Sequence, residues 1–528
     1  MAALTIIPVV FAVVAHILRA HGGPFWMWTI LDPSYYYLFD GLNLVNLTTP
    51  GQPFHPGTPV QVMVALVLKA AYPLQSARQI AETVLADPEA HLRLVSSAFI
   101  VLWALVMLAA GLFAHRRLGD IWSALLLQLG PFLSMVILMN AYHVKPEPVL
   151  MGLMLVLSMV VIAALEPQSL DRHRTRYAVL FGLLAGFGIA TKLTVAPIFV
   201  LPLLLLGNLR AMVLYGVVSV LGFLLFTAPI WGAYDRLWGF AGKVMASSGA
   251  YAAADSGVID LAAYPRAALK IASRPVVHVP ILAALVVLAL DRRRARAAGA
   301  GWSLEARALA GIALAMAVQV LAVAKQPTAN YMVPAYMLAP LALVVMRRLV
   351  ASWEWGSAPV RTWSARGFAL FVCLLAVMQV FSVLRLDRDL TDRVRVAGTV
   401  DDDRFRACAR IYVFPPSSHS FAMYRGDWES GLRHTALLRG LLPGNDYWLE
   451  QGTMDLRNAA GSQKLSDVLA AYPCLFIRGA HRGPITRYLQ AHAPDLKVRG
   501  KCSTRDEAVL TANVDCRGRL LADRPSWQ

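Results

Sequence analysis

Long hydrophobic runs, separated by short polar and basic stretches, occupy the first two-thirds of the chain. Several of these runs approach or exceed the roughly 18 residues that are typical of a membrane-spanning helix. We therefore predict about eleven transmembrane helices, and an all-α polytopic membrane domain over residues 1–384. The predicted spans lie near residues 4–20, 92–114, 120–139, 148–165, 177–191, 193–208, 211–232, 275–290, 305–324, 329–346 and 367–384.

The basic residues between the spans predict the orientation of the chain, because Lys and Arg collect in cytoplasmic loops. Alternate connections are basic: residues 115–117, 171–176, Arg210, 291–296 and 347–348. If these are cytoplasmic, the first loop at 21–91, a loop at 233–274 and everything after residue 384 are extracytoplasmic. We expect the loop at 233–274 to form a short amphipathic helix.

One apolar segment, at residues 59–74, competes with this scheme, because a crossing there would move residues 115–117 outside. The segment is short, is bounded by prolines and carries Lys69 in its middle. We expect it to lie along the outer membrane surface, beside a second interfacial helix near 34–47.

The composition agrees with a membrane protein. Hydrophobic residues make up 57% of the chain and charged residues 15%, whereas soluble proteins have roughly 45–50% and 25%. The net charge of +17 would suit nucleic acid, but we reject that partner because many arginines lie in short loops between spans. The first twenty residues lack a basic region and a cleavage site, so we expect the first helix to be retained.

A different pattern begins near residue 385, where the hydrophobic runs end. Short strand-like runs (ARIYVF, CLFIRG, AVLTANV) alternate with helix-like runs (LSDVLAAY, ITRYLQAH). This alternation predicts a small extracytoplasmic α/β domain over residues 385–528, which is long enough to form its own core.

Four of the five cysteines lie in this C-terminal part, which favours disulfides and an oxidising compartment. No CxxC pair is present, which argues against a metal site. Cys502 and Cys516 flank a predicted hairpin and would pair, leaving Cys408 with Cys474, but the sequence does not distinguish this from the other connectivities. Cys373 lies in an apolar run, and we expect it to be a free thiol in the core.

Ionisable residues at the extracytoplasmic ends of the spans are the candidates for chemistry, because charge at membrane depth is costly and usually functional. They form five clusters: Asp32 with Tyr35, Tyr36 and Tyr37; His55; Asn140 to Glu147, with His143 and Lys145; Thr191 and Lys192; and Lys325 to Tyr331. Acids and cations at one membrane face suit a phosphorylated lipid substrate. Lysines hold a phosphate as point charges, and a carboxylate takes a proton from an acceptor hydroxyl.

Each cluster also has a structural explanation. Asp32 precedes Pro33 and would cap a helix. His143 and Lys145 would extend to the membrane interface, and Glu147 would pair with Lys145. The tyrosines would form an aromatic belt, and the two later lysines would anchor their helices. The joint occurrence of these residues on one face favours the functional interpretation.

The order of these features resembles the GT-C superfamily of membrane glycosyltransferases, in particular the branch of protein mannosyltransferases and bacterial lipid A aminoarabinose transferases. The matching segments, in chain order, are LDPSYYY with Asp32, HPGTPVQVMVALVLKAAYP, HLRLVSSAFIVL with Arg93, AHRRLGD, LGPFLSMVILMNAYHVKPEPVLM with Glu147, GFGIATKLTVAP with Lys192, and AKQPTANYMVPAYMLAP with Lys325 and Tyr331. Three features depart from the family pattern: His55 replaces a lysine, Glu147 stands where aspartate is usual, and the tail from 385 matches no motif.

The resemblance implies a GT-C-like fold and an inverting transfer from a polyprenyl-phosphate sugar. It implies that Asp32 is the general base and that Glu147 orients the acceptor or a metal. The donor phosphate would be held by Lys192, Lys325 and Arg93. The substrates would contact Tyr35, His55, His143, Lys145 and Tyr331. Some relatives need a divalent cation and others do not, so no cofactor is assigned.

We therefore expect a glycosyltransferase in a bacterial inner membrane, with its active site on the periplasmic side and a lipid or envelope glycan as acceptor. A lipid-linked glycan flippase would instead carry charges at mid-membrane and internal pseudo-symmetry, and the sequence shows neither. A glycan polymerase or ligase with a diphosphate-linked donor would also gather basic residues outside. In an inactive family member, the tail would act as a binding module.

Overall fold

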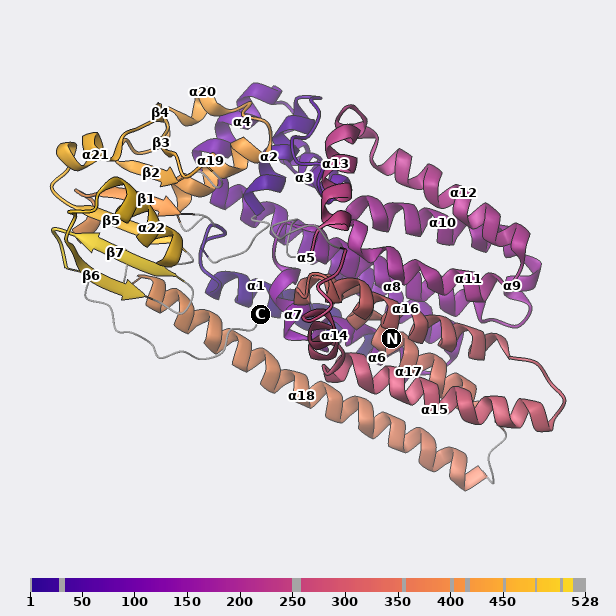
Figure 1. Cartoon of the computed structure of the whole chain (residues 1–528). Coiled ribbons are helices and arrows are strands. Elements are labelled where there is room, and N and C mark those ends of the chain that lie inside the picture. The colour runs from indigo at the N-terminus through magenta and orange to yellow at the C-terminus, as the bar shows by residue number, and fades with distance from the viewer. Residues whose placement is uncertain are drawn as a thin grey trace.

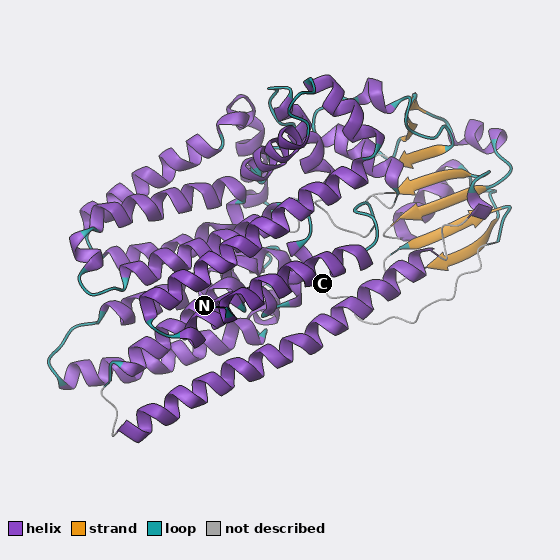
Figure 2. Cartoon of the chain, turned by 180° about the vertical axis from the view of Figure 1, so that it is seen from behind, coloured by secondary structure: helices purple, strands orange, loops and turns teal. Residues whose placement is uncertain are grey.

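The computed structural model describes residues 2–27, 34–248, 258–353, 358–398, 403–413, 418–449, 453–479, 482–503 and 507–515. The helices pack side by side into an elongated bundle, and a β-sheet lies at one end of it (Figure 1). The view from behind shows the same division, with all strands gathered at that end (Figure 2). The chain is thus a polytopic helical protein with a C-terminal α/β region, as the sequence predicts.

Eight helical segments in the described part of the chain are long and apolar enough to cross a membrane. They are α1 (Ala3–His21), α5 (Pro88–Leu118), α8 (Pro146–Ala164), α12 (Leu209–Phe226), α15 (Pro275–Ala297), α16 (Leu304–Ala324), η5 (Ala329–Met332) with α17 (Val333–Ala351), and α18 (Ala358–Gly398).

The three remaining predicted spans are also helical, but they are shorter, more polar or broken. They are α10 (Arg174–Thr191), η2 (Leu193–Val200) with α11 (Leu201–Leu206), and α6 (Ile121–Gln128) with η1 (Gly130–Phe132) and α7 (Met135–Ala141). Pro131, Pro197 and Pro202 lie at the irregular points, because proline removes a backbone donor and disturbs a continuous helix.

The basic loops meet at the end of the bundle away from the sheet. Arg117, in the last turn of α5, binds Glu166, after α8, at 2.7 Å. Arg348, near the end of α17, binds Glu305 at 3.1 Å, and Arg294 donates to the carbonyl of Trp353 at 2.7 Å. These contacts join loops that the charge pattern places on one side. A short helix, α9 (Ser169–Arg172), lies in one of them.

The connections at the opposite end carry shorter helices: α2 (Ser34–Val45), α3 (Thr58–Ala71), α4 (Ala77–Ala86), η3 (Ala228–Ala233), α13 (Tyr234–Ala246) and α14 (Tyr264–Ala272). Both ends of α3 contact this same end of the bundle. Before it, the carbonyl of His55 accepts a hydrogen bond from the Leu193 amide at 2.9 Å. After it, Tyr72 bonds His91, near the start of α5, at 2.7 Å. The apolar segment therefore lies across the end of the bundle.

The C-terminal region holds a seven-stranded mixed sheet in the order β4-β3-β2-β1-β5-β7-β6. The strands are β1 (Ala409–Val413), β2 (Asp446–Leu449), β3 (Leu456–Asn458), β4 (Gly461–Ser462), β5 (Leu475–Gly479), β6 (Val498–Ser503) and β7 (Ala508–Ala512). Strand β1 is parallel to β2 and β5, and the other pairs are antiparallel. A 3-10 turn, η6 (Asp403–Phe405), precedes the first strand.

Side chains alternate along β1, so the sheet has two apolar faces. Ile411 packs with residues of α21 (Leu465–Ala471) and α22 (Arg482–His492) on one face. Tyr412 packs on the other face with Phe421 of α19 (His419–Glu429). Both faces of the sheet are therefore covered, as is usual where strands are parallel.

Helix α19 joins the sheet region to the helical bundle, because it also packs on α2. The Asn43 side chain donates to the carbonyl of Ser430 at 2.9 Å. Gly426 lies so close to Phe39 that a Cβ there would meet the ring at 2.8 Å. The C-terminal region thus rests on the first loop.

The cysteines bear on two predictions. Cys408 and Cys474 form a disulfide, as expected. Cys516 lies outside the described residues, so the predicted pair with Cys502 does as well. The expectation of a core thiol at Cys373 is wrong: this side chain is exposed on α18. Helix α18 lies along the edge of the bundle (Figure 1), so most of its surface has no protein neighbour.

Candidate active site

A single carboxylate holds both flanks of the segment that contains Asp32. Asp32 itself, in residues 28–33, lies outside the described residues. Glu89, in the first turn of α5, accepts hydrogen bonds from the Phe25 amide at 2.9 and 3.0 Å and from the Tyr35 hydroxyl at 2.9 Å. Glu89 thereby fixes the chain on either side of the expected base.

Arg93, one helical turn after Glu89, is exposed. Tyr35 is buried. Burial, together with the charge and hydrogen bond of Glu89, raises the pKa of Tyr35 well above its usual value. Tyr35 is therefore a neutral phenol whose hydroxyl donates a hydrogen bond to the Glu89 carboxylate.

The turn between α7 and α8 lies against the start of α2. The Val144 amide donates to Ser34 Oγ at 3.1 Å. His143 in this turn is buried and packs edge-on against Phe25, with ring centroids 5.8 Å apart. Burial, and then the nearby charge of Lys145, lower the pKa of His143 well below its usual value, so the imidazole is neutral.

A buried arginine near the end of α1 adds a cation to this region. The Arg19 guanidinium lies 4.0 Å from the centre of the Phe25 ring and 5.3 Å from that of Tyr142. Among the described residues, its Nη2 atom has no hydrogen-bond partner. A buried cation that packs on aromatic rings and has one nitrogen without a partner among the described residues suits an anionic group.

A second group of predicted residues meets inside the same end of the bundle. Lys192 Nζ lies 2.8 Å from Glu147 Oε1, and the two side chains are only 1% and 2% exposed. The same ammonium lies 4.5 Å from the centre of the Tyr331 ring. Residues 147, 192 and 331 are distant in sequence and come from three different connections. Packing therefore places the Lys192 ammonium next to one carboxylate and the face of one aromatic ring.

Local backbone structure explains how these side chains reach one another. Pro146 occupies the first position of α8 and Glu147 lies in its first turn, which favours an acid through the helix dipole. Lys192 follows α10 with an extended backbone (φ −163°, ψ 123°), and the irregular helix η2 begins directly after it. The break between the two helices places Lys192 in the bundle interior.

The remaining predicted residues are placed differently. His55 lies beside Lys192 in space, because its carbonyl binds the amide of the next residue, Leu193. Lys145 is buried at the start of α8. Lys325 turns toward α13, where its Nζ donates to the carbonyl of Met245 at 2.7 Å.

Three residues of this region have no predicted role from sequence: Glu89, Arg19 and Asp40. Glu89 looks like an ordinary first-turn acid of a helix, and Arg19 like a basic residue at the end of a span. Asp40 lies inside α2 and accepts hydrogen bonds from the Gly51 amide at 2.6 Å and from the Gln61 side chain at 2.9 Å. These roles depend on partners far along the chain, so no local signal identifies them.

Among the described residues, no group of three or more His, Cys, Asp and Glu side chains is arranged to hold a metal ion. Asp32 lies outside the described residues.

The fold and site define a multi-pass membrane protein with a polar, buried cluster at the end of the bundle that carries the α/β region. No protein-family model matches the sequence, and no curated protein matches it. Two crystal structures of ArnT from Cupriavidus metallidurans are similar to the chain, one described as bound to undecaprenyl phosphate and one as the apo state.

The identity is 14% and the TM-score 0.43 in both cases. The match covers 96% of this chain and 98% or 97% of the other. At this distance the comparison assigns no role to any residue of this chain.

Proposed function

We propose that the protein is an inverting glycosyltransferase that moves a sugar from a polyprenyl-phosphate donor to a lipid or glycan acceptor on the extracytoplasmic side of a bacterial inner membrane. The observation that carries the proposal is the gathering of buried cations and acids at one end of the bundle. Arg19, Lys145 and Lys192 lie there with Glu147, next to the flanks of the Asp32 segment.

The cations suit the donor. A lipid phosphate carries negative charge at the membrane surface. Lysine binds it as a point charge, and arginine binds it through two N–H groups of its planar guanidinium. We assign donor phosphate binding to Lys192, Lys325 and Arg93, and add Arg19 because its Nη2 has no partner in the part of the chain that the structure describes. Undecaprenyl phosphate, bound in one ArnT crystal structure, belongs to this class of lipid.

In the proposed reaction, Asp32 takes the proton from an acceptor hydroxyl as its oxygen attacks the anomeric carbon. The bond from that carbon to the phosphate oxygen breaks, and polyprenyl phosphate leaves with the bonding electrons. The cations stabilise the charge on the leaving phosphate. Glu147 orients the acceptor and holds the Lys192 ammonium in place.

The other assigned residues shape the substrate site. Tyr35, His55, His143, Lys145 and Tyr331 would contact donor or acceptor groups. We divide the chain into a catalytic membrane domain, 1–384, and an extracytoplasmic domain, 385–528. The first loop, 21–91, would cover the active site between these two domains.

Replacing the proposed base tests the function. Cells that lack the protein would be complemented with wild type, Asp32→Asn, or the control Asp235→Asn, which changes an exposed acid on α13. We expect one envelope lipid or glycan to lose a single sugar mass, by mass spectrometry, in the deletion and with Asp32→Asn, but not with the control. Full rescue by Asp32→Asn at normal protein level would contradict the assigned role and favour a transport function.

A further inference from the structure

A cavity of about 170 Å³ lies in the C-terminal region, between the helices α19 and α20 (Thr435–Leu438) and the strands β2, β3 and β4. Helix α19 separates it from α2 and the first loop. Its volume is below the roughly 300–1,000 Å³ of pockets for drug-sized ligands. The cavity therefore suits a single compact ring.

Aromatic side chains form one wall of the cavity. Tyr424 of α19 stacks on Trp448 of β2, with ring centroids 4.2 Å apart and planes inclined by 26°. Trp428, one turn after Tyr424, is half-buried and also lines the cavity. Trp448 is 1% exposed, and its indole N–H has no hydrogen-bond partner among the described residues. A buried donor without an acceptor is unusual in native proteins.

Aliphatic and polar residues line the rest of the cavity, among them Leu432, Leu438 and Leu442 and the buried Asp427. Arg439, after α20, and Arg457 and Asn458, on β3, all contribute to its lining. Asn458 Oδ1 accepts a hydrogen bond from the Ala460 amide at 2.9 Å, which shapes the turn into β4. Together the lining presents aromatic rings, aliphatic side chains, several N–H donors and one carboxyl group.

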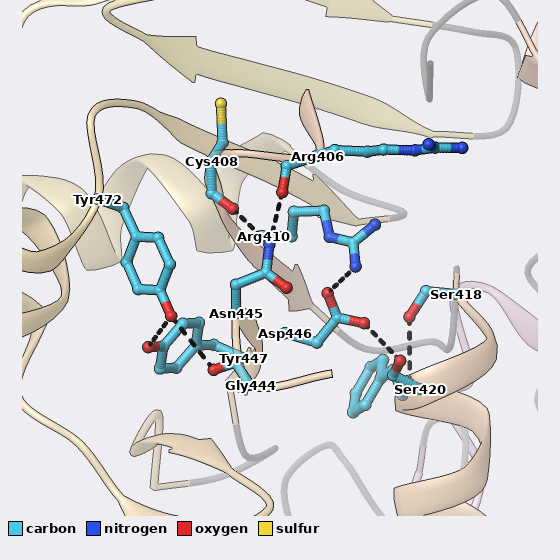
Figure 3. Close-up of polar contacts among 11 residues, drawn as sticks. Arg406, Cys408, Arg410, Ser418, Ser420, Gly444, Asn445, Asp446, Tyr447 and Tyr472 are labelled. Atoms are coloured by element: carbon cyan, nitrogen blue, oxygen red, sulfur yellow. Dashed lines mark hydrogen bonds and ion pairs between the residues drawn. The ribbon is translucent and has the colours of Figure 1, made fainter. Parts of the chain in front are cut away.

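The frame around the cavity is held by polar contacts (Figure 3). Asp446 on β2 binds Arg410 of β1 at 2.6 Å and accepts a hydrogen bond from Ser420 of α19. Ser418 caps α19 by accepting from the Phe421 amide at 3.1 Å. These contacts fix α19 against the sheet, so the aromatic wall is pre-formed.

We propose that this cavity binds a saccharide unit. The C–H face of a pyranose is apolar and stacks on aromatic rings such as those of Trp428 and Tyr424. Its hydroxyl oxygens accept hydrogen bonds from the surrounding N–H groups. Two arginines suit a carboxylate or phosphate substituent on that sugar.

This inference deepens the proposed function, on which it rests in one respect: the saccharide would belong to the acceptor glycan. The C-terminal region contacts the first loop through α19 and α2. A sugar held on the other side of α19 would bring a glycan chain to the extracytoplasmic end of the bundle. Saccharide binding itself can be measured without any transfer.

The test uses the full-length protein in lipid nanodiscs and saturation-transfer NMR with methyl glucoside, glucuronic acid, glucose 6-phosphate and inorganic phosphate. Wild type should bind at least one sugar, and Trp428→Ala should weaken it at least tenfold. Trp302→Ala, which removes an exposed tryptophan from a basic loop, should bind as wild type does. If Trp428→Ala does not fold, Arg457→Gln serves in its place and should weaken the anionic sugars selectively.

Two results would overturn the proposal: no sugar binds to wild type, or sugars bind to Trp428→Ala as tightly as to wild type. Inorganic phosphate competing as well as glucose 6-phosphate would also overturn it, since the cavity would then be an anion site. Asp32→Asn should keep saccharide binding. If wild type binds saccharide but transfers no sugar, the proposed function is wrong and the saccharide site stands. If wild type transfers sugar but binds no saccharide in this cavity, the proposed function stands and the saccharide site is wrong.

Discussion

At the scale of single residues, the Glu147–Lys192 pair is the feature that most needs a function to explain it. Taking two charges out of water costs several kcal/mol per ion, and a pair often recovers no more than that. An apolar pair of similar size would be as stable. The contact of Lys192 with the Tyr331 ring adds a further constraint on its position. We interpret the pair as a cation held ready for an anionic substrate.

A double substitution separates stability from function at this pair. Lys192→Met removes one partner of the buried Glu147 carboxylate, and we expect it to lower stability by roughly 3–5 kcal/mol. Lys192→Met with Glu147→Leu should recover most of the thermal midpoint but none of the glycosyl transfer. The midpoint is measured in detergent and transfer by envelope mass spectrometry. Recovery of transfer in the double variant would show that the pair is structural.

At the scale of elements, Asp40 organises the first loop. Its carboxylate accepts from the amides of Gly51 and Gln52 and from the side chains of Asn43 and Gln61. One carboxylate thus joins α2, the following turn and α3. The Asn43 side chain also donates to the carbonyl of Ser430, directly after α19, so the same hydrogen-bond network positions the C-terminal region.

Burial raises the pKa of Asp40 to about 7, against the opposing effect of the Gly51 and Gln52 amides. The pKa in the unfolded chain is about 3.9. The folded state therefore binds the proton more tightly, so the stabilisation is complete below about pH 4 and is lost as the pH rises through 7.

We predict that the stability advantage of wild type over Asp40→Asn shrinks between about pH 4 and 7, by at most about 1.4 kcal/mol per pH unit. Asparagine does not titrate, and its amide group would face other donors, so the variant should be less stable at low pH with a flatter profile. Thermal midpoints of both proteins across this range test the prediction. Parallel profiles would mean that Asp40 stays ionised.

At the scale of the whole molecule, the ends of the bundle differ in chemistry. One end collects arginine-rich loops that pair with one another. The other collects the buried acids and cations and carries the disulfide-linked sheet. Helix α18, with 41 residues, is about 60 Å long, and it runs from the basic end to the sheet (Figure 1).

The disulfide tests this orientation. Cys408 and Cys474 should resist maleimide labelling in native membranes and react after reduction, because an extracytoplasmic compartment is oxidising. Cys408→Ser removes a link across 66 residues, which we expect to cost about 4 kcal/mol. Cys373→Ser is the matched control and should leave the link intact. Free labelling of both thiols in the absence of reductant would place the sheet in the cytoplasm.

The sequence by itself determined the helical bundle, the separate α/β region and the sharing of one end by the polar clusters. A long hydrophobic run crosses a bilayer as a helix, because a helix forms all of its backbone hydrogen bonds internally. Alternate connections must then return to the same end. The segments around His55, His143, Lys192 and Tyr331 therefore meet there whatever the details of packing.

Only the tertiary structure decided which of these groups touch. Glu147 has Lys145 as its nearest cation in sequence, but its carboxylate also lies 2.8 Å from the ammonium of the distant Lys192. Lys325 has the same local setting as Lys192, yet it turns to α13. Glu89 binds Tyr35, which is 54 residues away in sequence, and the lining of the cavity behind α19 comes from residues between Tyr424 and Gly461. Helix rotation and packing choose among partners of equal charge, and neither is encoded in local spacing.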